Sequence, residues 1–131
     1  MVGITELDKL LSAMSPELQR QEFVFCTVTG DIGDYSSLYP IATFFESEGL
    51  TLILEKPIAE KAGLKFEGSF RQITLTVHSS LEAVGLTAAV STKLASKGIS
   101  ANVIATYYHD HIFVQSSKAD AALLALQEFG A

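Results

Sequence analysis

Two similar stretches decide the fold of this chain: residues 41–54 read IATFFESEGLTLIL, and residues 104–114 read IATYYHDHIFV. Each begins with Ile-Ala-Thr and two aromatic residues, crosses a short polar segment and enters an apolar run. Ile104 follows Ile41 at an offset of 63 residues (104 minus 41), close to half of the 131-residue chain. Alternating apolar residues on both sides of a polar turn predict a β-hairpin in each stretch.

The elements around the two hairpins occur in the same order. A strand precedes each hairpin and a helix follows it. The expected strands are EFVFCTV (22–28) and FRQITLTVH (70–78), and the expected helices are PIAEKAG (57–63) and ADAALLALQEF (119–129). Ser117 and Asp120 are expected to cap the last helix. This order indicates a duplication, in which Phe44 aligns with Tyr107 and Phe45 with Tyr108.

The two halves differ between the first strand and the hairpin. In the second half, residues 79–84 form a turn before a helix over about 85–97, and Ser79 and Glu82 match an S-x-x-E capping box. In the first half, the Gly-, Asp- and Ser-rich residues 29–37 predict only a loop. A helix over residues 5–14, capped by Thr5, is expected to fill the vacant place.

Strand, helix, hairpin and helix make up most of a ferredoxin-like unit. The sequence therefore predicts an α+β fold of two ferredoxin-like modules, residues 1–68 and 69–131, with antiparallel sheets backed by helices.

Composition excludes several functional classes. A net charge of −6 and an isoelectric point near 4.9 argue against nucleic acid as a partner, because phosphate binding needs clustered Lys and Arg. No apolar run approaches the roughly 20 residues of a membrane span, so no membrane partner is expected. The single cysteine, Cys26, lies in an apolar run and predicts a buried thiol and a cytoplasmic protein. A hydrophobic content of 48% is high enough to suggest a subunit interface.

The stretch VHSSLEAVGLT (77–87) carries the most chemical information. A strand leads into a serine-rich turn at the start of a helix, where free amides and the helix dipole favour an anion such as a carboxylate. Gly85 has no Cβ, so a ligand can approach the backbone closely. In the alternative interpretation, Ser79 and Glu82 satisfy each other as a capping box, and Gly85 only permits close packing.

The segment YYHDH (107–111) raises the question of a metal. On a strand His109 and His111 point to one side and Asp110 to the other, so the three side chains do not converge without His78 or a second subunit. Asp110 is better suited to pair with a ligand ammonium group, and Tyr107 to line an apolar wall. Glu46 and Glu48, at the other hairpin, either hold a cation or are solvated turn residues. The chain has no nucleophile elbow, phosphate loop or other catalytic or cofactor motif, so neither an enzyme nor a cofactor is expected.

Two segments carry a family resemblance: HSSLEAVGLTAAVSTKLASKGISANVIATYYHDHIFV (78–114) and EGLTLILEK (48–56). From about Phe23 to Leu126 the chain resembles small bacterial tandem ACT-domain proteins of unknown function. It is more distantly similar to the regulatory ACT regions of aspartate kinase and to the CASTOR-type arginine sensors. The resemblance implies ferredoxin-like ACT modules that associate side by side and hold amino acids or other small effectors between modules or subunits.

The related sensors also imply a set of ligand-binding residues. Backbone groups of the turn would bind a ligand carboxylate, and residues at the second hairpin would contact the amino group and side chain. The implied residues are His78, Ser79, Ser80, Leu81, Val84, Gly85, Thr106, Tyr107 and Asp110. Because the sensors have four ACT modules and this chain has two, a homodimer or higher homo-oligomer is expected. The first half lacks the helix start, so no equivalent site is expected there.

Together with the resemblance, these features predict a non-catalytic regulatory protein whose small-molecule effector is an amino acid. Two other functions stay open at this point. One is a protein–protein interaction module without a small-molecule ligand. The other is a metal-dependent activity that uses His78, His109 and His111, within one chain or across subunits.

Overall fold

The computed structural model describes residues 6–130, and these residues form two compact units. Unit 1 contains the described residues up to Arg20 together with those from Arg71 onward, and unit 2 contains Gln21–Phe70. Strand β1 contributes residues to both units, so the two compact units do not correspond to one domain boundary along the chain. The division into residues 1–68 and 69–131 stays a prediction. Thr5, the expected helix cap, lies outside the described residues.

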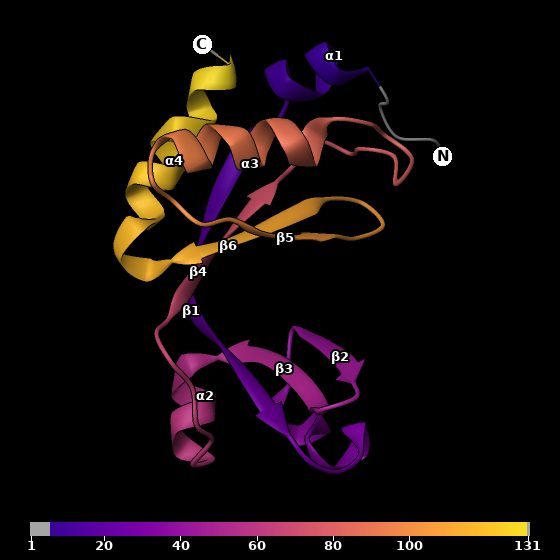
Figure 1. Cartoon of the computed structure of the whole chain (residues 1–131), viewed down its shortest axis with the longest axis vertical. Coiled ribbons are helices and arrows are strands. Elements are labelled where there is room, and N and C mark those ends of the chain that lie inside the picture. The colour runs from indigo at the N-terminus through magenta and orange to yellow at the C-terminus, as the bar shows by residue number, and fades with distance from the viewer. Residues whose placement is uncertain (1–5, 131) are drawn as a thin grey trace. The chain divides into compact units, whose positions relative to one another are not determined.

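Unit 2 is a hairpin that pairs with a longer strand and is followed by a short helix (Figure 1). Its elements are the C-terminal part of β1 (Pro16–Val28), the 3₁₀ turns η1 (Ile32–Asp34) and η2 (Ser36–Leu38), β2 (Ala42–Glu46), β3 (Gly49–Glu55) and α2 (Lys56–Lys61). The strand order is β2-β3-β1, and both pairings are antiparallel. The strand, hairpin and helix predicted for this part of the chain are confirmed.

The core of unit 2 follows the alternation of β1 and β3. Val24 and Cys26 on β1 and Leu50, Leu52 and Leu54 on β3 lie in one buried cluster, which also contains Ala59 of α2. Cys26 is buried as predicted, and burial raises the pKa of its thiol because the thiolate would lose solvation.

Unit 1 consists of strands with helices on one face (Figure 1). Its elements are α1 (Leu7–Ser12), the N-terminal part of β1, β4 (Phe70–Leu75), α3 (Leu86–Ser96), β5 (Asn102–Ala105), β6 (Asp110–Gln115), the 3₁₀ turn η3 (Ser116–Lys118), α4 (Ala119–Gln127) and the 3₁₀ turn η4 (Glu128–Gly130). The strand order is β1-β4-β6-β5, with β5 and β6 antiparallel. The predicted second hairpin and the helices at both of its sides are confirmed.

Alternation along the strands also defines the core of unit 1. Ile73 and Leu75 of β4 and Ile112 and Val114 of β6 are buried against α3 and α4. Leu10 of α1 is fully buried in the same cluster. The N-terminal helix therefore packs with elements of the second half of the chain, and the expectation that it fills the vacant place in the first half is wrong. Among the described residues, no helix is both long and apolar enough to cross a membrane.

Several element ends differ from the predictions. Strand β1 begins at Pro16 and not at residue 22, because hydrogen bonds with neighbouring chain segments extend it through the polar residues PELQRQ. Residues 29–37 contain η1 and part of η2 rather than an irregular loop. Helix α4 has Lys118 at its N-cap without a side-chain cap, so the expected capping by Ser117 and Asp120 is wrong. The preceding 3₁₀ turn already brings the chain into the helix.

The residue-by-residue alignment of the two hairpins is also wrong. Phe44 and Phe45 are paired strand residues of β2, opposite Thr51 and Leu50. Tyr107 and Tyr108 lie in the turn after β5, which ends at Ala105. The order of elements repeats, but the two similar pentapeptides, IATFF (41–45) and IATYY (104–108), occupy different structural positions.

Candidate functional site

The candidate site begins with the turn that links β4 to α3. The turn is held by Ser80, whose hydroxyl accepts a hydrogen bond from the Glu82 amide at 3.1 Å and whose carbonyl accepts one from the Ala83 amide at 3.0 Å. Helix α3 starts only after Gly85, which is the N-cap and has φ +99°. The predicted capping box of Ser79 and Glu82 is therefore wrong, because both residues precede the helix.

The second part of the site is the turn between β5 and β6. The amide and the hydroxyl of Thr106 both donate to the His109 carbonyl, at 3.0 and 2.7 Å. This pair of bonds closes a four-residue turn and delivers Asp110 to the first position of β6. Thr106 therefore shapes the turn through its polar groups.

Ser79 and Asp110 connect the two turns. The Ser79 hydroxyl donates a hydrogen bond of 2.9 Å to Oδ2 of Asp110, and both residues are buried, with relative exposures of 6% and 8%. A small cavity of about 60 Å³ lies beside this bond, and we refer to it as the turn cavity. It is lined by Ser79, Ser80, Leu81, Ala83, Leu86, Thr87, Ala105 and Asp110. Four of the nine residues implied by the resemblance thus lie around one cavity.

An aromatic cluster lies near these turns. The ring centroid of His78 is 6.5 Å from that of Tyr107 and 5.3 Å from that of Tyr108, and the two tyrosine rings meet edge to face at 4.9 Å. Both tyrosines are more than half exposed. His78 and Tyr107 therefore lie near each other in this aromatic cluster. Neither residue lines the turn cavity.

The remaining implied residues do not line the turn cavity. Val84 is exposed on the surface. Gly85 faces Leu7 of α1, because a Cβ at this glycine would lie 3.1 Å from Leu7 Cδ2. The space beside Gly85, where a ligand was expected to approach the backbone, is thus filled by Leu7 of the N-terminal helix.

A polar network on the other face of β6 was not predicted as functional. Nδ1 of His111 lies 2.9 Å from Gln72 Nε2 and 3.1 Å from Thr74 Oγ1, both on β4. Gln72 and Thr74 are buried. The alternation of β4 did place polar residues opposite Ile73 and Leu75, and that signal could have directed attention to the network.

Burial lowers the pKa of His111, because a charged imidazolium would lose solvation. The neighbouring His109 lowers this pKa further, and the negative charge of Asp110 acts in the opposite direction. The structure thus favours the neutral form of His111.

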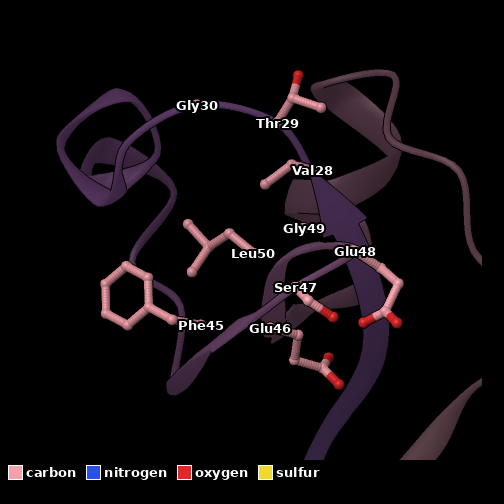
Figure 2. Close-up of a pocket in the computed structure, with 9 residues that line it drawn as sticks. All are labelled: Val28, Thr29, Gly30, Phe45, Glu46, Ser47, Glu48, Gly49 and Leu50. Atoms are coloured by element: carbon pink, nitrogen blue, oxygen red, sulfur yellow. The ribbon is translucent and has the colours of Figure 1, made fainter.

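A larger hollow lies at the first hairpin, and we refer to it as the first-hairpin hollow (Figure 2). It has a volume of about 300 Å³ and is lined by Val28, Thr29, Gly30, Phe45, Glu46, Ser47, Glu48, Gly49 and Leu50. Oε1 of Glu46 accepts a hydrogen bond from the Thr51 hydroxyl. Because both carboxylates are exposed, the first-hairpin hollow has the character of a solvated turn.

The histidines do not converge on a metal position. The ring centroids of His109 and His111 are 6.4 Å apart and their planes are nearly perpendicular. Across residues 6–130, no group of three or more His, Cys, Asp or Glu side chains has an arrangement that could hold a metal ion. The Nδ1 atom of His111 is also engaged with β4, so these side chains give no support to a metal site within one chain.

Comparisons with known proteins agree with this architecture. Two models of the ACT domain match the chain, one over residues 2–71 and the other over residues 67–128. No curated protein sequence matches. A Vibrio cholerae protein of unknown function, described as a possible transport protein, is 64% identical in sequence, and its crystal structure aligns with a TM-score of 0.89 over 95% of this chain and 96% of that one.

Two more distant structures share the fold. An Agrobacterium tumefaciens protein has a TM-score of 0.72 at 13% identity, over 88% of this chain and 87% of that one. The ligand-free regulatory subunit of aspartate kinase from Thermus thermophilus has a TM-score of 0.63 at 10% identity, over 92% and 99% of the two chains. Identities this low show similarity of fold alone.

Proposed function

Because the chain belongs to the ACT-domain family, we propose that it is a non-catalytic regulatory protein that binds an amino-acid effector beside the start of α3. The supporting observation is the buried contact between Ser79 and Asp110 at this position. A buried carboxylate that has one neutral hydroxyl as its partner is well suited to bind an ammonium group, since a charged donor forms a stronger hydrogen bond than a neutral one.

The opposite end of an amino acid would be held by the start of α3. Gly85 has no side chain to cap the helix, so no capping side chain occupies the amides of the first turn. Amides at a helix start and the positive end of the helix dipole favour a carboxylate. An effector in this position would thus have its ammonium group at Asp110 and its carboxylate beside residues 86–88.

The turn cavity must enlarge to accept such a ligand. Its volume of about 60 Å³ is well below the roughly 300–1,000 Å³ of typical ligand pockets. The effector would displace the Ser79 hydroxyl from Asp110 and move the turn of residues 79–84. Leu81 and Val84 on this turn expose apolar side chains that a second subunit could cover. We therefore include a homodimer in the proposal.

A thermal-shift screen of the twenty amino acids tests this function. A ligand at 100 times its dissociation constant stabilises the protein by about 2.7 kcal/mol, which raises the melting temperature by several degrees. D110N should abolish the response, because the amide cannot form an ion pair with an ammonium group. D120N, which changes an exposed carboxylate on α4, should retain it. The absence of a shift with every amino acid at millimolar concentration would contradict the proposal.

A protein–protein interaction module is the second candidate, and a different part of the surface favours it. Strand β2 is the outer strand of unit 2 and carries Phe44 and Phe45, and Tyr39 and Ile41 lie just before it. These four apolar side chains are between 47% and 82% exposed. An edge strand that is unpaired along one side and carries exposed aromatic residues is suited to pair with another chain.

Association measurements separate the two candidates. If β2 mediates association, F44S should lower the molar mass measured by light scattering, or release a co-purified partner, without changing any amino-acid response. The matched variant L124S alters an equally exposed residue of α4 and should leave association intact. Unchanged association in F44S would exclude this role for β2.

A further inference from the structure

Strand β6 links the candidate effector site to a buried histidine. Asp110 and His111 are consecutive residues whose side chains point to opposite faces of the strand. Asp110 accepts the hydrogen bond from Ser79, whereas His111 contacts Gln72 and Thr74 of β4. A change of charge at either residue is therefore felt by the other across a single peptide unit.

The hydrogen bonds around His111 favour its neutral form. Nε2 of Gln72 can only donate, so Nδ1 of His111 must be the acceptor in their 2.9 Å contact. The Thr74 hydroxyl accepts from Gln19 Nε2 at 3.3 Å, which leaves its own proton free to donate to His111 at 3.1 Å. A proton on Nδ1 would face two donors and would force the Gln72 amide and the Thr74 hydroxyl to turn.

Few charges act on His111. Along its own segment these are His109, which disfavours a proton, and Asp110, which favours one. On β4, Arg71 is directed to the Gln19 carbonyl, at 2.9 and 2.7 Å. Strand β5 contains no titratable residue and places Ile104 opposite His111. Asp110 is thus the group through which an event in the turn cavity reaches His111.

We propose that a proton on His111 and an ammonium group at Asp110 oppose each other, so that the protein binds its effector more weakly when His111 is protonated. The inference rests on the proposed function, because it assumes that the ammonium group pairs with Asp110. An ammonium group there neutralises the negative charge of Asp110, which favours the proton on His111. Linkage makes the effect reciprocal, so the proton disfavours the ammonium group by the same free energy.

The first experiment measures the coupling without any effector. In ¹³C-labelled protein, the Cε1–H signals of His78, His109 and His111 are followed by NMR as a function of pH, and the signal lost in H111Q belongs to His111. D110N should lower the midpoint of the His111 titration, since the favourable negative charge is gone. D120N should leave it unchanged. An equal midpoint in D110N and the wild type would overturn the inference.

The second experiment adds an unlabelled equimolar mixture of the twenty amino acids to the labelled protein. The mixture should lower the His111 midpoint in the wild type and leave that of D110N unchanged. The dissociation constant of the active component should then decrease as the pH rises through the midpoint. By linkage, the fold-change in affinity between the two pH plateaus should equal ten raised to the midpoint shift in pH units.

The two experiments separate failure of the inference from failure of the proposed function. If D110N shifts the midpoint and the mixture does not, the coupling between Asp110 and His111 stands and an amino acid at Asp110 is excluded. If the mixture stabilises the protein but affinity is independent of pH across the midpoint, the effector site stands and the opposition between proton and ammonium is overturned.

Discussion

The two hairpins of this protein show how one sequence pattern can occupy two structural positions. In β2–β3, the pattern Ile-Ala-Thr-Phe-Phe continues through the strand to Glu46, and the turn consists of Ser47 and Glu48 alone. In β5–β6, the corresponding stretch Ile-Ala-Thr-Tyr-Tyr leaves the strand after Ala105, and the turn takes four residues, Thr106 to His109. The chain direction reverses in both, at different points of the pattern.

Local chemistry explains the difference. Gly49 lies against β1 at the end of the tight turn. A Cβ on Gly49 would lie only 3.0 Å from the Val28 carbonyl oxygen, so a glycine permits this close approach. The second hairpin has no glycine at its turn and closes instead through the two hydrogen bonds from Thr106 to His109. The wider turn places Asp110 beside Ser79, whereas the tighter turn leaves Glu46 and Glu48 in solvent. The two hairpins thus differ both in the length of their turns and in whether their carboxylates are buried or exposed.

The largest expected effect concerns the strands that support each hairpin. L52A in β3 and I112A in β6 each remove a fully buried side chain and should each lower the free energy of unfolding by about 2–5 kcal/mol. Urea denaturation followed by circular dichroism measures the loss. L124A, at an exposed position of α4, should change the free energy by no more than about 0.5 kcal/mol. If only one of the two core variants lost little free energy of unfolding, the two hairpins would not be equally important for stability.

The tight turn should depend on its glycine. G49A should destabilise the protein by on the order of 1–3 kcal/mol, because the added Cβ meets the Val28 backbone and the residue has a φ of +158°. G33A is the matched control, since a Cβ there has no atom within 4 Å. Wild-type stability of G49A in the same denaturation assay would show that the close approach to β1 is not required.

The wide turn should depend on Ser79. S79A leaves the buried carboxylate of Asp110 without its hydroxyl donor, which should cost on the order of 1–3 kcal/mol. S80A removes an acceptor for one amide in the exposed part of the same turn and should cost less. If the two variants unfold at the same urea concentration, the Ser79–Asp110 bond contributes little to the second hairpin.

A smaller effect is the dependence of the unfolding free energy on pH. It should arise in the second half of the chain, since all three histidines lie from residue 78 to residue 111. Burial lowers the pKa of His111 in the folded protein, so folding favours its neutral form. This stabilisation is present above the unfolded pKa of about 6.5 and is lost as the pH falls through the folded pKa. Urea midpoints from pH 7.5 to 5 should decrease less in H111Q than in the wild type, and equal slopes would contradict the assignment.

Sequence periodicity was sufficient for the order of elements and for much of the core. The alternation of Ile73 and Leu75 identified one buried face of β4, and the apolar run around Cys26 identified the buried part of β1. Helix α3 and the hairpins were recognised because apolar spacing and turn residues are local properties of the chain. Recognition of the turn at residues 77–87 followed in the same way from its serines and the helix that comes after it.

Contacts with segments distant in the sequence decided several features that local sequence patterns could not predict. The polar residues before residue 22 become strand only because neighbouring chain segments pair with them. The capping motif at Ser79 matched the local pattern, but the Ser79 hydroxyl bonds to Asp110, 31 residues away. At Gly85 the sequence leaves open whether a ligand or the protein itself approaches the backbone, and in the structure Leu7 lies against it. No local pattern encodes these contacts, because each depends on a segment distant in the sequence.

By itself, the sequence determined a doubled strand–connection–hairpin–helix order, because the periods of strands and helices are set by backbone geometry within each segment. Tertiary structure alone decided where each hairpin turns, which carboxylate is buried and that burial lowers the pKa of His111. Those outcomes depend on hydrogen bonds and desolvation between residues brought together by folding, and such energies exist only once the segments are in contact.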